Sequence, residues 1–290
     1  MIKPNPLKAI GLLLLAMTIL PLIDVVAKFL GREGIPVIQM VWARFFFGAL
    51  FTLPFALAIG GVKGLVPSLP RLHSGRAMLL ILGTAFFFWA LKYLPIADTL
   101  AIYFVQPIII TALSPWLLGE EVDMRRWIMV ALGFAGVLII IRPGFQALNP
   151  GMFLALAAGS CSAFYILLTR HITGKANAML TTFHTSMIGA LALTVLMPFI
   201  WINLTPWQML QMVLLGGIAI AGHYLITRAY DFGEASLLSP FNYAEMIVAV
   251  LAGWYFFGDF PDAYTFLGVA ILICCAIYIS WHERPKSNPA

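Results

Sequence analysis

The sequence predicts an all-α membrane protein in which ten transmembrane helices form two inverted five-helix repeats. The composition is the first reason: 62% of the 290 residues are hydrophobic and 10% are charged, whereas soluble domains are about 45–50% apolar and about 25% charged. The 22 Phe also exclude a disordered chain. Long apolar stretches and a weak likeness between the two halves of the chain are the second and third reasons.

The apolar stretches are long enough to cross a membrane, which takes about 20 residues per helix. Segments with Gly, Pro and Asn separate them. The stretches cover residues 9–30, 37–59, 77–94, 97–118, 126–141, 151–170, 179–200, 208–229, 235–257 and 264–281. No small-residue cleavage site follows the first, so we expect it to be retained. The predicted units are a tail at 1–8, a first repeat at 9–141, a second repeat at 151–281 and a tail at 282–290.

Lys and Arg are unequally distributed between the segments that join these stretches. With the amino terminus in the cytoplasm, the inner segments hold Lys3, Lys8, Lys63, Arg71, Arg76, Arg125, Arg126, Arg170, Lys175, Arg228, Arg284 and Lys286, and the outer ones hold Lys28, Arg32, Lys92 and Arg142. Positive charge accumulates on the cytoplasmic side of membrane proteins. The bias therefore predicts that both termini are cytoplasmic. Because the basic residues flank apolar stretches, the net charge of +5 does not indicate nucleic-acid binding.

The two halves resemble each other around their fourth and ninth apolar stretches. Residues 93–101 (Tyr-Leu-Pro-Ile-Ala-Asp-Thr-Leu-Ala) align with residues 230–238 (Tyr-Asp-Phe-Gly-Glu-Ala-Ser-Leu-Leu), and Gly119-Glu120 aligns with Gly258-Asp259. Because each repeat would hold an odd number of helices, the second copy must lie upside down in the bilayer. Inverted repeats are typical of secondary transporters, whose substrate site lies near the bilayer midplane between the repeats.

Two charged residues of the first repeat fall at matching depths in the predicted bilayer. Asp24 lies about six residues below the outer end of its helix and Arg44 about seven below the outer end of the next. Charge within a membrane is costly and is therefore a functional candidate. We expect an Asp24–Arg44 ion pair, and both a structural role and a role in gating or substrate contact stay open. Lys28, one turn above Asp24, is expected to reach the outer interface or to contact substrate.

A second group of polar residues is expected near the midplane. Glu245 lies about ten residues into its helix, and Gln106 is its counterpart in the first repeat. Glu245 could take up a proton in a coupled cycle, bind a polar ligand, or hydrogen-bond a neighbouring helix. The candidate substrate-binding residues are Glu245, Gln106, Tyr103, Asn242, Tyr243, Trp89 and Arg44, and the candidates for gating or ion pairing are Asp24, Arg44, Lys28 and His223.

Several other kinds of function have no support in the sequence. His-Glu-x-x-His, Gly-x-Ser-x-Gly and the phosphate-binding Walker glycine loop do not occur, so we expect neither an enzyme nor an ATP-driven pump. The three Cys lie in apolar stretches, where they indicate packing and no disulfide framework. No cofactor and no metal site are predicted, and the expected partners are the lipid bilayer and a small-molecule substrate.

Several segments resemble a known family. They are residues 20–28 (Leu-Pro-Leu-Ile-Asp-Val-Val-Ala-Lys), 41–47 (Val-Trp-Ala-Arg-Phe-Phe-Phe), 235–245 (Ala-Ser-Leu-Leu-Ser-Pro-Phe-Asn-Tyr-Ala-Glu) and 257–262 (Phe-Gly-Asp-Phe-Pro-Asp). On these segments the chain resembles drug/metabolite transporters of the EamA type, with two five-helix units. The nearest branches in appearance are the bacterial riboflavin transporters and then the S-adenosylmethionine transporters.

This resemblance implies a multi-pass protein of the cell inner membrane that moves a small metabolite by alternating access. Riboflavin uptake is the first expectation, because residues 20–28 and 235–243 look nearer to the riboflavin branch. S-adenosylmethionine transport and the efflux of amino acids or drugs are the alternatives. A homodimer stays open.

Overall fold

The computed structural model of the protein describes residues 4–141, 149–258 and 263–282. These residues form helices joined by short turns, and no strand occurs among them. The helices of the first half are α1 (Pro6–Ile19), α2 (Pro21–Arg32), α3 (Val37–Gly60), η1 (Val62–Leu65), α4 (Pro70–Ala90), α5 (Ile96–Tyr103), α6 (Val105–Leu118) and α7 (Met124–Ile141). Those of the second half are α8 (Pro150–Ile172), α9 (Ala178–Thr194), α10 (Met197–Ile200), α11 (Pro206–Phe232), α12 (Ala235–Leu238), η2 (Ser239–Tyr243), α13 (Ala244–Phe257) and α14 (Ala263–His282).

The helices coincide with the apolar stretches of the sequence. Within the described ranges, seven helical segments are long and apolar enough to cross a membrane, and three of these consist of consecutive helices: α1 with α2, α5 with α6, and α12 with η2 and α13. The helix α9 is apolar but shorter. The all-α class and the membrane-spanning character are therefore confirmed. Ten crossings remain a prediction.

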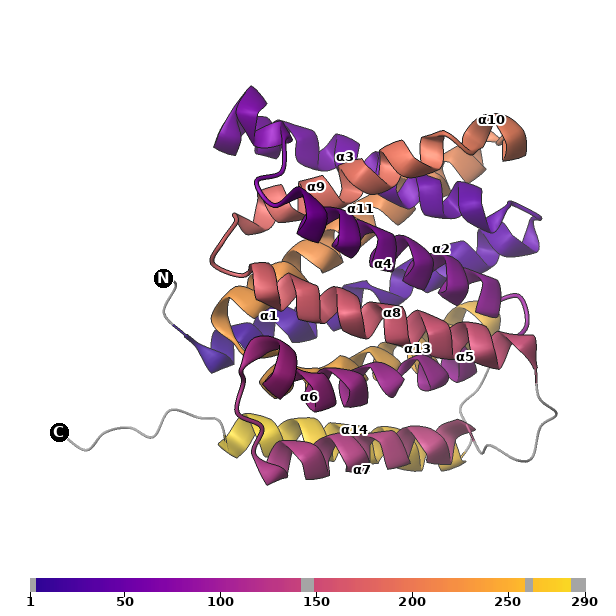
Figure 1. Cartoon of the computed structure of the whole chain (residues 1–290). Helices are drawn as coiled ribbons and strands as arrows, with labels where there is room; N and C mark the ends of the chain where they lie inside the picture. The colour runs from indigo at the N-terminus through magenta and orange to yellow at the C-terminus, as the bar shows by residue number, and fades with distance from the viewer. Residues whose placement is uncertain (1–3, 142–148, 259–262, 283–290) are drawn as a thin grey trace.

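The helix packing repeats itself about a pseudo-two-fold axis. The second helical segment of each half, α3 and α9, pack against each other, and so do the last ones, α7 and α14. The third segment of each half packs against the first segment of the other half, α4 against α8 and α11 against α1. Helices of one half therefore pack against helices of the other half along the whole bundle (Figure 1). Such symmetric pairing is expected if the two halves are copies of one unit. The predicted alignment also holds in the backbone, because Gly119 and Gly258 both end their helices in the left-handed conformation, with φ of 67° and 74°.

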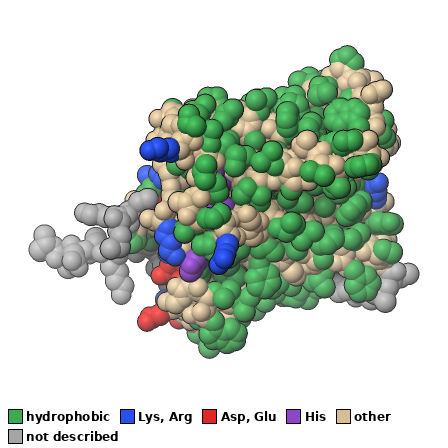
Figure 2. Space-filling view, turned by 45° about the horizontal axis from the view of Figure 1, so that its top comes forward, with side chains coloured by type: hydrophobic (Ala, Val, Ile, Leu, Met, Phe, Trp, Pro, Cys, Tyr) green, Lys and Arg blue, Asp and Glu red, His purple; other side chains and the backbone are tan. Residues whose placement is uncertain are grey.

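The ends of the bundle and its sides differ in character. The start of α1 and the end of α14 lie at the same end of the bundle, on the left in Figure 1. In Figure 2, hydrophobic side chains cover the face between the two ends, and charged side chains gather near the ends. This distribution fits a bundle whose axis crosses a bilayer, since an uncharged belt matches the hydrocarbon layer.

One residue in the count of inner basic residues was misassigned. Arg76 lies in α4 with an exposed fraction of 0%, so it is not a surface charge at a loop. Its guanidinium is solvated by hydroxyl groups of α8 and α9 in place of water. Lys3, Arg142, Arg284 and Lys286 lie outside the described residues, as do the tail at 283–290 and Asp259 of the repeat alignment.

Three prolines interrupt the helices that approach the centre of the bundle. Proline has no N–H to donate to the carbonyl four residues earlier, so the backbone bends or changes its hydrogen-bonding pattern there. Pro21 follows the junction of α1 and α2, Pro107 follows the junction of α5 and α6 at Phe104, and Pro240 lies in the 3-10 segment η2. Irregular backbone inside a membrane is tolerated where it is covered by protein or lines a cavity.

The arrangement of the helices predicts from which side of the membrane an added reagent reaches each connecting segment. After Cys161, Cys274 and Cys275 are replaced by Ala, we expect Lys63→Cys and Lys175→Cys to react with an impermeant maleimide from one side, and Glu33→Cys and Asn203→Cys from the other. All four positions are exposed and lie in the segments that connect the long helices at the bundle ends, Lys63 in the short helix η1. Reaction of positions 63 and 175 from opposite sides would contradict the interlocked bundle.

Candidate functional site

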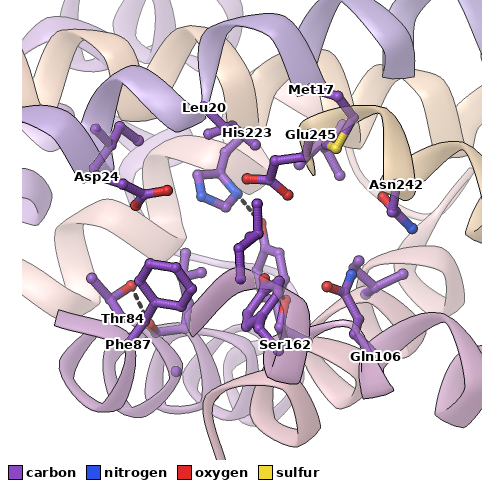
Figure 3. A pocket seen from close by; sticks show the side chains of 18 of the residues that line it. Met17, Leu20, Asp24, Thr84, Phe87, Gln106, Ser162, His223, Asn242 and Glu245 are labelled. Atoms are coloured by element: carbon purple, nitrogen blue, oxygen red, sulfur yellow. Dashed lines mark hydrogen bonds between the residues drawn. The ribbon is translucent and has the colours of Figure 1, made fainter. Parts of the chain in front are cut away.

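A cavity lies between the two halves of the bundle, beside the proline-interrupted helices. It contains about 720 Å³ of space between the side chains, the part that is open to solvent at its mouth included. We call it the central cavity. Its polar lining residues are Asp24, Arg44, Thr84, Tyr103, Gln106, Ser162, Tyr165, His223, Asn242 and Glu245, and most of them are seen in Figure 3. Both repeats contribute to it, as expected for a site on the axis between them.

Two carboxyl groups face this cavity from α2 and α13. Asp24 lies in the first turn of α2, after the bend at Leu20, and Glu245 lies in the first turn of α13, after η2. Both side chains point into the open space in Figure 3. In the described part of the chain neither carboxyl makes a hydrogen bond or an ion pair, although both act electrostatically on Arg44. A buried carboxyl without a partner is costly, so these two groups are available to a ligand.

The expected direct ion pair of Asp24 and Arg44 is not formed among the described residues. The guanidinium of Arg44 instead donates to Thr84 Oγ1 and contacts His223 Nε2. Arg44 comes from α3 and is 8% exposed. Since α4 and α11 bring an acceptor on each side of it, two of its N–H groups have partners without the carboxylate. His223, which we expected at the inner gate, therefore belongs to the central cavity.

The other predicted site residues divide into those inside and those outside the cavity. Gln106, Tyr103 and Asn242 line it, and the Tyr103 hydroxyl donates to Ser162 Oγ at 2.6 Å. Tyr243 does not line it, because successive residues of a 3-10 segment point about 120° apart. Its hydroxyl donates to the Val130 carbonyl of α7 at 3.2 Å, on the far side of η2.

Trp89 is also absent from the cavity wall, and its neighbours Phe87 and Phe88 take its place. The cavity-facing residues of α4 are adjacent pairs that repeat every four positions, as helix geometry requires: Leu79, Leu80, Gly83, Thr84, Phe87 and Phe88. A run of four consecutive aromatics (86–89) hides this register in the sequence. The Phe87 and Tyr103 rings pack edge to face with centroids 5.3 Å apart, so the wall of the cavity is partly aromatic.

Sequence reasoning missed a buried hydrogen-bond network that begins at the cavity. His223 Nδ1 lies 3.2 Å from the Tyr165 hydroxyl, which accepts from Arg76 Nη2 at 3.0 Å. Arg76 also donates to Thr169 Oγ1 and Thr185 Oγ1, both at 2.8 Å. The hydroxyl residues on the apolar stretches at 151–170 and 179–200 are the signal that could have revealed it. The network ties α4 to α8, α9 and α11.

The end of the bundle that holds the start of α1 is closed by a second polar cluster. Glu120 follows α6 and accepts from the Ala235 and Ser236 backbone N–H groups, both at 3.0 Å, and from Arg170 Nε at 3.1 Å. Arg126 donates to Glu234 at 2.8 Å. We call these five residues, Glu120, Arg126, Arg170, Glu234 and Ser236, the polar clamp. It joins the first repeat to the second where α12 begins.

The opposite end is more open. A wide cavity of about 1150 Å³, much of it open to solvent, is lined by Lys28, Arg32, Lys92 and by Phe88, which also lines the central cavity. The Lys28 ammonium lies 4.6 Å from the centroid of the Phe257 ring. Lys28 thus lies at the interface end of α2, as one of its two expected roles requires. A ligand entering from this end would meet Phe88 before the carboxyls.

Metal binding has no support in the geometry. Among residues 4–141, 149–258 and 263–282, no group of three or more His, Cys, Asp or Glu is placed to hold an ion. Within these ranges, the ionisable groups of the central cavity are two carboxyls, one guanidinium, one imidazole and two phenols. That set suits binding through charge and hydrogen bonds.

Comparison with known proteins agrees with this architecture. The chain is 25% identical over 275 residues to an S-adenosylmethionine uptake transporter of Rickettsia bellii, with 95% of this chain and 94% of the relative covered. It is 30% identical over 282 residues to a riboflavin transporter of Rhizobium johnstonii (93% and 90% covered) and 27% identical over 297 residues to a riboflavin transporter of Vibrio cholerae (99% and 97% covered). One solved crystal structure superposes with a TM-score of 0.75 at 20% identity, covering 97% of this chain and 98% of the other.

The match to a family is as extensive as the match to these relatives. The pattern of the EamA-like transporter family fits residues 7–142 and again residues 149–281. These two segments are the two halves that interlock around the central cavity. The chain therefore belongs to the EamA-like transporter family, within the drug/metabolite transporter superfamily.

Proposed function

We propose that the protein is a secondary transporter that takes up S-adenosylmethionine by alternating access of two inverted repeats. It crosses the inner membrane ten times and has both termini in the cytoplasm. The observation that carries the proposal is the central cavity, which both repeats line and which presents Asp24, Glu245 and Arg44 together. Family membership supports transport, and the charges inside the cavity support the cargo.

The charges of the cavity complement those of S-adenosylmethionine. This molecule carries a sulfonium and an ammonium group, both positive, and one carboxylate. The cavity offers two carboxyls without a partner in the described part of the chain and one guanidinium. Phe87, Phe88 and Tyr103 provide ring faces for a cation or an adenine base, and the amides of Gln106 and Asn242 can read the edge of a base. Each charge of the cargo then has a counterpart, which a buried site requires.

Riboflavin is the second candidate. The sequence alone favours it, the aromatic wall suits a flat ring system, and the relatives at 27% and 30% identity carry that name. A neutral ligand, however, leaves the two carboxyls and Arg44 facing each other across the cavity without new partners. The charge pattern therefore places riboflavin behind S-adenosylmethionine in our proposal.

Uptake by cells that produce the protein separates these candidates. We expect radiolabelled S-adenosylmethionine to accumulate at least about tenfold above cells with an empty vector, and a hundredfold excess of unlabelled riboflavin not to compete. Saturable riboflavin uptake without S-adenosylmethionine uptake would select the second candidate. Saturable uptake of neither would contradict both cargo assignments.

The carboxyl of Glu245 is predicted to bind a positive group of the cargo. Glu245→Gln keeps the size of the side chain and removes its charge, and loss of one partner of a desolvated charge pair costs about 2–5 kcal/mol. We expect the apparent affinity for S-adenosylmethionine to fall more than about tenfold with an unchanged amount of protein in the membrane. Glu33→Gln is the matched control, since Glu33 is exposed and outside the central cavity. Normal uptake by the Glu245→Gln variant would remove Glu245 from the site.

The polar clamp is predicted to hold one end shut while the other is open. Glu120→Gln removes the charge that binds Arg170 and the two backbone N–H groups of residues 235 and 236. Hydrogen bonds to charged groups contribute about 1.5–3 kcal/mol, so we expect labelling of Leu237→Cys from the clamped end to accelerate about tenfold. Leu237 is 3% exposed in the closed bundle.

The neighbouring Glu121 provides the control for this measurement. Its side chain is exposed and makes no recorded contact within the described part of the chain. We expect Leu237→Cys to be labelled at the same rate in the Glu121→Gln variant as in the protein that keeps Glu121. Equal rates for Glu120→Gln and Glu121→Gln would show that the clamp does not control access.

A further inference from the structure

A second, smaller cavity lies beside the central one. It is bounded by α3, α4, α8, α9 and α11 and has room for about one water-sized particle. We call it the side cavity. Arg44, Tyr165 and His223 line both cavities, whereas Thr185 and Ser186 of α9 line only the side cavity. The cargo site described above does not use this space.

An unbalanced positive charge lies next to the side cavity. Arg76 is 0% exposed, and its recorded partners are the Thr169, Tyr165 and Thr185 side chains and the Thr181 carbonyl, all neutral. Within the described ranges no carboxylate lies within ion-pair distance of it. Arg44 at least faces Asp24 and Glu245, but Arg76 has no such counterpart. A buried cation without a counter-charge is strongly unfavourable.

The hydrogen bonds of His223 show that the O–H group of Tyr165 donates neither to His223 nor to Arg76. Arginine can only donate, so His223 Nε2 must accept from Arg44 and the ring hydrogen must lie on Nδ1. The Nδ1–H group then donates to the Tyr165 oxygen, 3.2 Å away. That oxygen also accepts from Arg76 at 3.0 Å. Both of its lone pairs are occupied, and its own O–H must donate elsewhere.

Two further donors border the same space. Ser186 is 6% exposed, and its hydroxyl makes no recorded hydrogen bond in the described part of the chain. Arg44 has five N–H donors, of which one donates to Thr84 and one to His223. The side chains of Tyr165, Ser186 and Arg44, which carry these donors, all line the side cavity.

We propose that the side cavity binds one small inorganic anion of the size of chloride. The anion accepts from Tyr165, Ser186 and Arg44, and it balances the charge of Arg76 through the Tyr165 hydroxyl, which accepts from Arg76. A water molecule has only two acceptor positions and no charge, so it satisfies neither the three donors nor the guanidinium. The anion is a second ligand, distinct from the cargo, and the proposal does not depend on the cargo assignment.

The test measures thermal unfolding of the purified full-length protein in detergent, without cargo. Sodium chloride is titrated against sodium gluconate at constant ionic strength, because gluconate is too large for the side cavity. We expect chloride to raise the unfolding midpoint saturably by several degrees, and bromide to act like chloride. In Ser186→Ala, which loses one donor to the anion, the half-saturating chloride concentration is expected to rise about tenfold.

Ser160→Ala is the matched control, because Ser160 lies outside both cavities and donates to the Leu156 carbonyl of its own helix. It is expected to keep the half-saturating concentration of the parent. Bromide-soaked crystals should show an anomalous peak beside Ser186 Oγ and the Tyr165 hydroxyl. Equal midpoints in chloride and gluconate, an unchanged half-saturation in Ser186→Ala, or a peak elsewhere only would overturn the anion site. Because no cargo is present, these results are independent of the uptake experiments.

Discussion

The central constraint on this fold is that polar groups inside a bilayer cannot rely on bulk water. Each must find a partner in the protein or face a cavity. Arg76 shows the first solution, with hydroxyls of α8 and α9 around its guanidinium. Asp24 and Glu245 show the second, because they face the central cavity and have no protein partner recorded in the described ranges. Inside a bilayer these two carboxyls are tolerated only next to a cavity, and this explains why the central cavity lies beside them.

The same constraint explains why the interrupted helices meet at the site. Pro21, Pro107 and Pro240 each deprive a carbonyl of its helical partner, which is acceptable only near a cavity or under cover of another helix. The breaks place Asp24, Gln106 and Glu245 at the start of new helical segments. Bent segments can also change their angle with less loss of hydrogen bonding than straight ones, and this suits the alternating access proposed for the protein.

The sequence predicted the fold class, the positions of the helices and most of the polar residues of the central cavity, because these depend on local patterns. Apolar length indicates a span, and an isolated charge such as Glu245 indicates a site. Register could not be predicted where the pattern is uniform: four consecutive aromatics do not reveal that Phe87 and Phe88 face the cavity and Trp89 does not. The sequence also could not predict the hydrogen-bond partner of Arg44, because whether Arg44 bonds Asp24 or Thr84 depends on tertiary distances.

The distribution of satisfied and unsatisfied groups separates the moving from the stable parts of the protein. Around Arg76 the hydrogen bonds join α4 of the first half to α8 and α9 of the second, and the polar clamp likewise joins the two halves. A transporter must break such contacts at one end while it forms others at the opposite end. The clamp lies at the bundle end, where water can replace its hydrogen bonds, whereas the Arg76 network lies inside, where nothing can. The clamp is therefore the contact between the halves that can open at low cost, and the Arg76 network is the one that cannot.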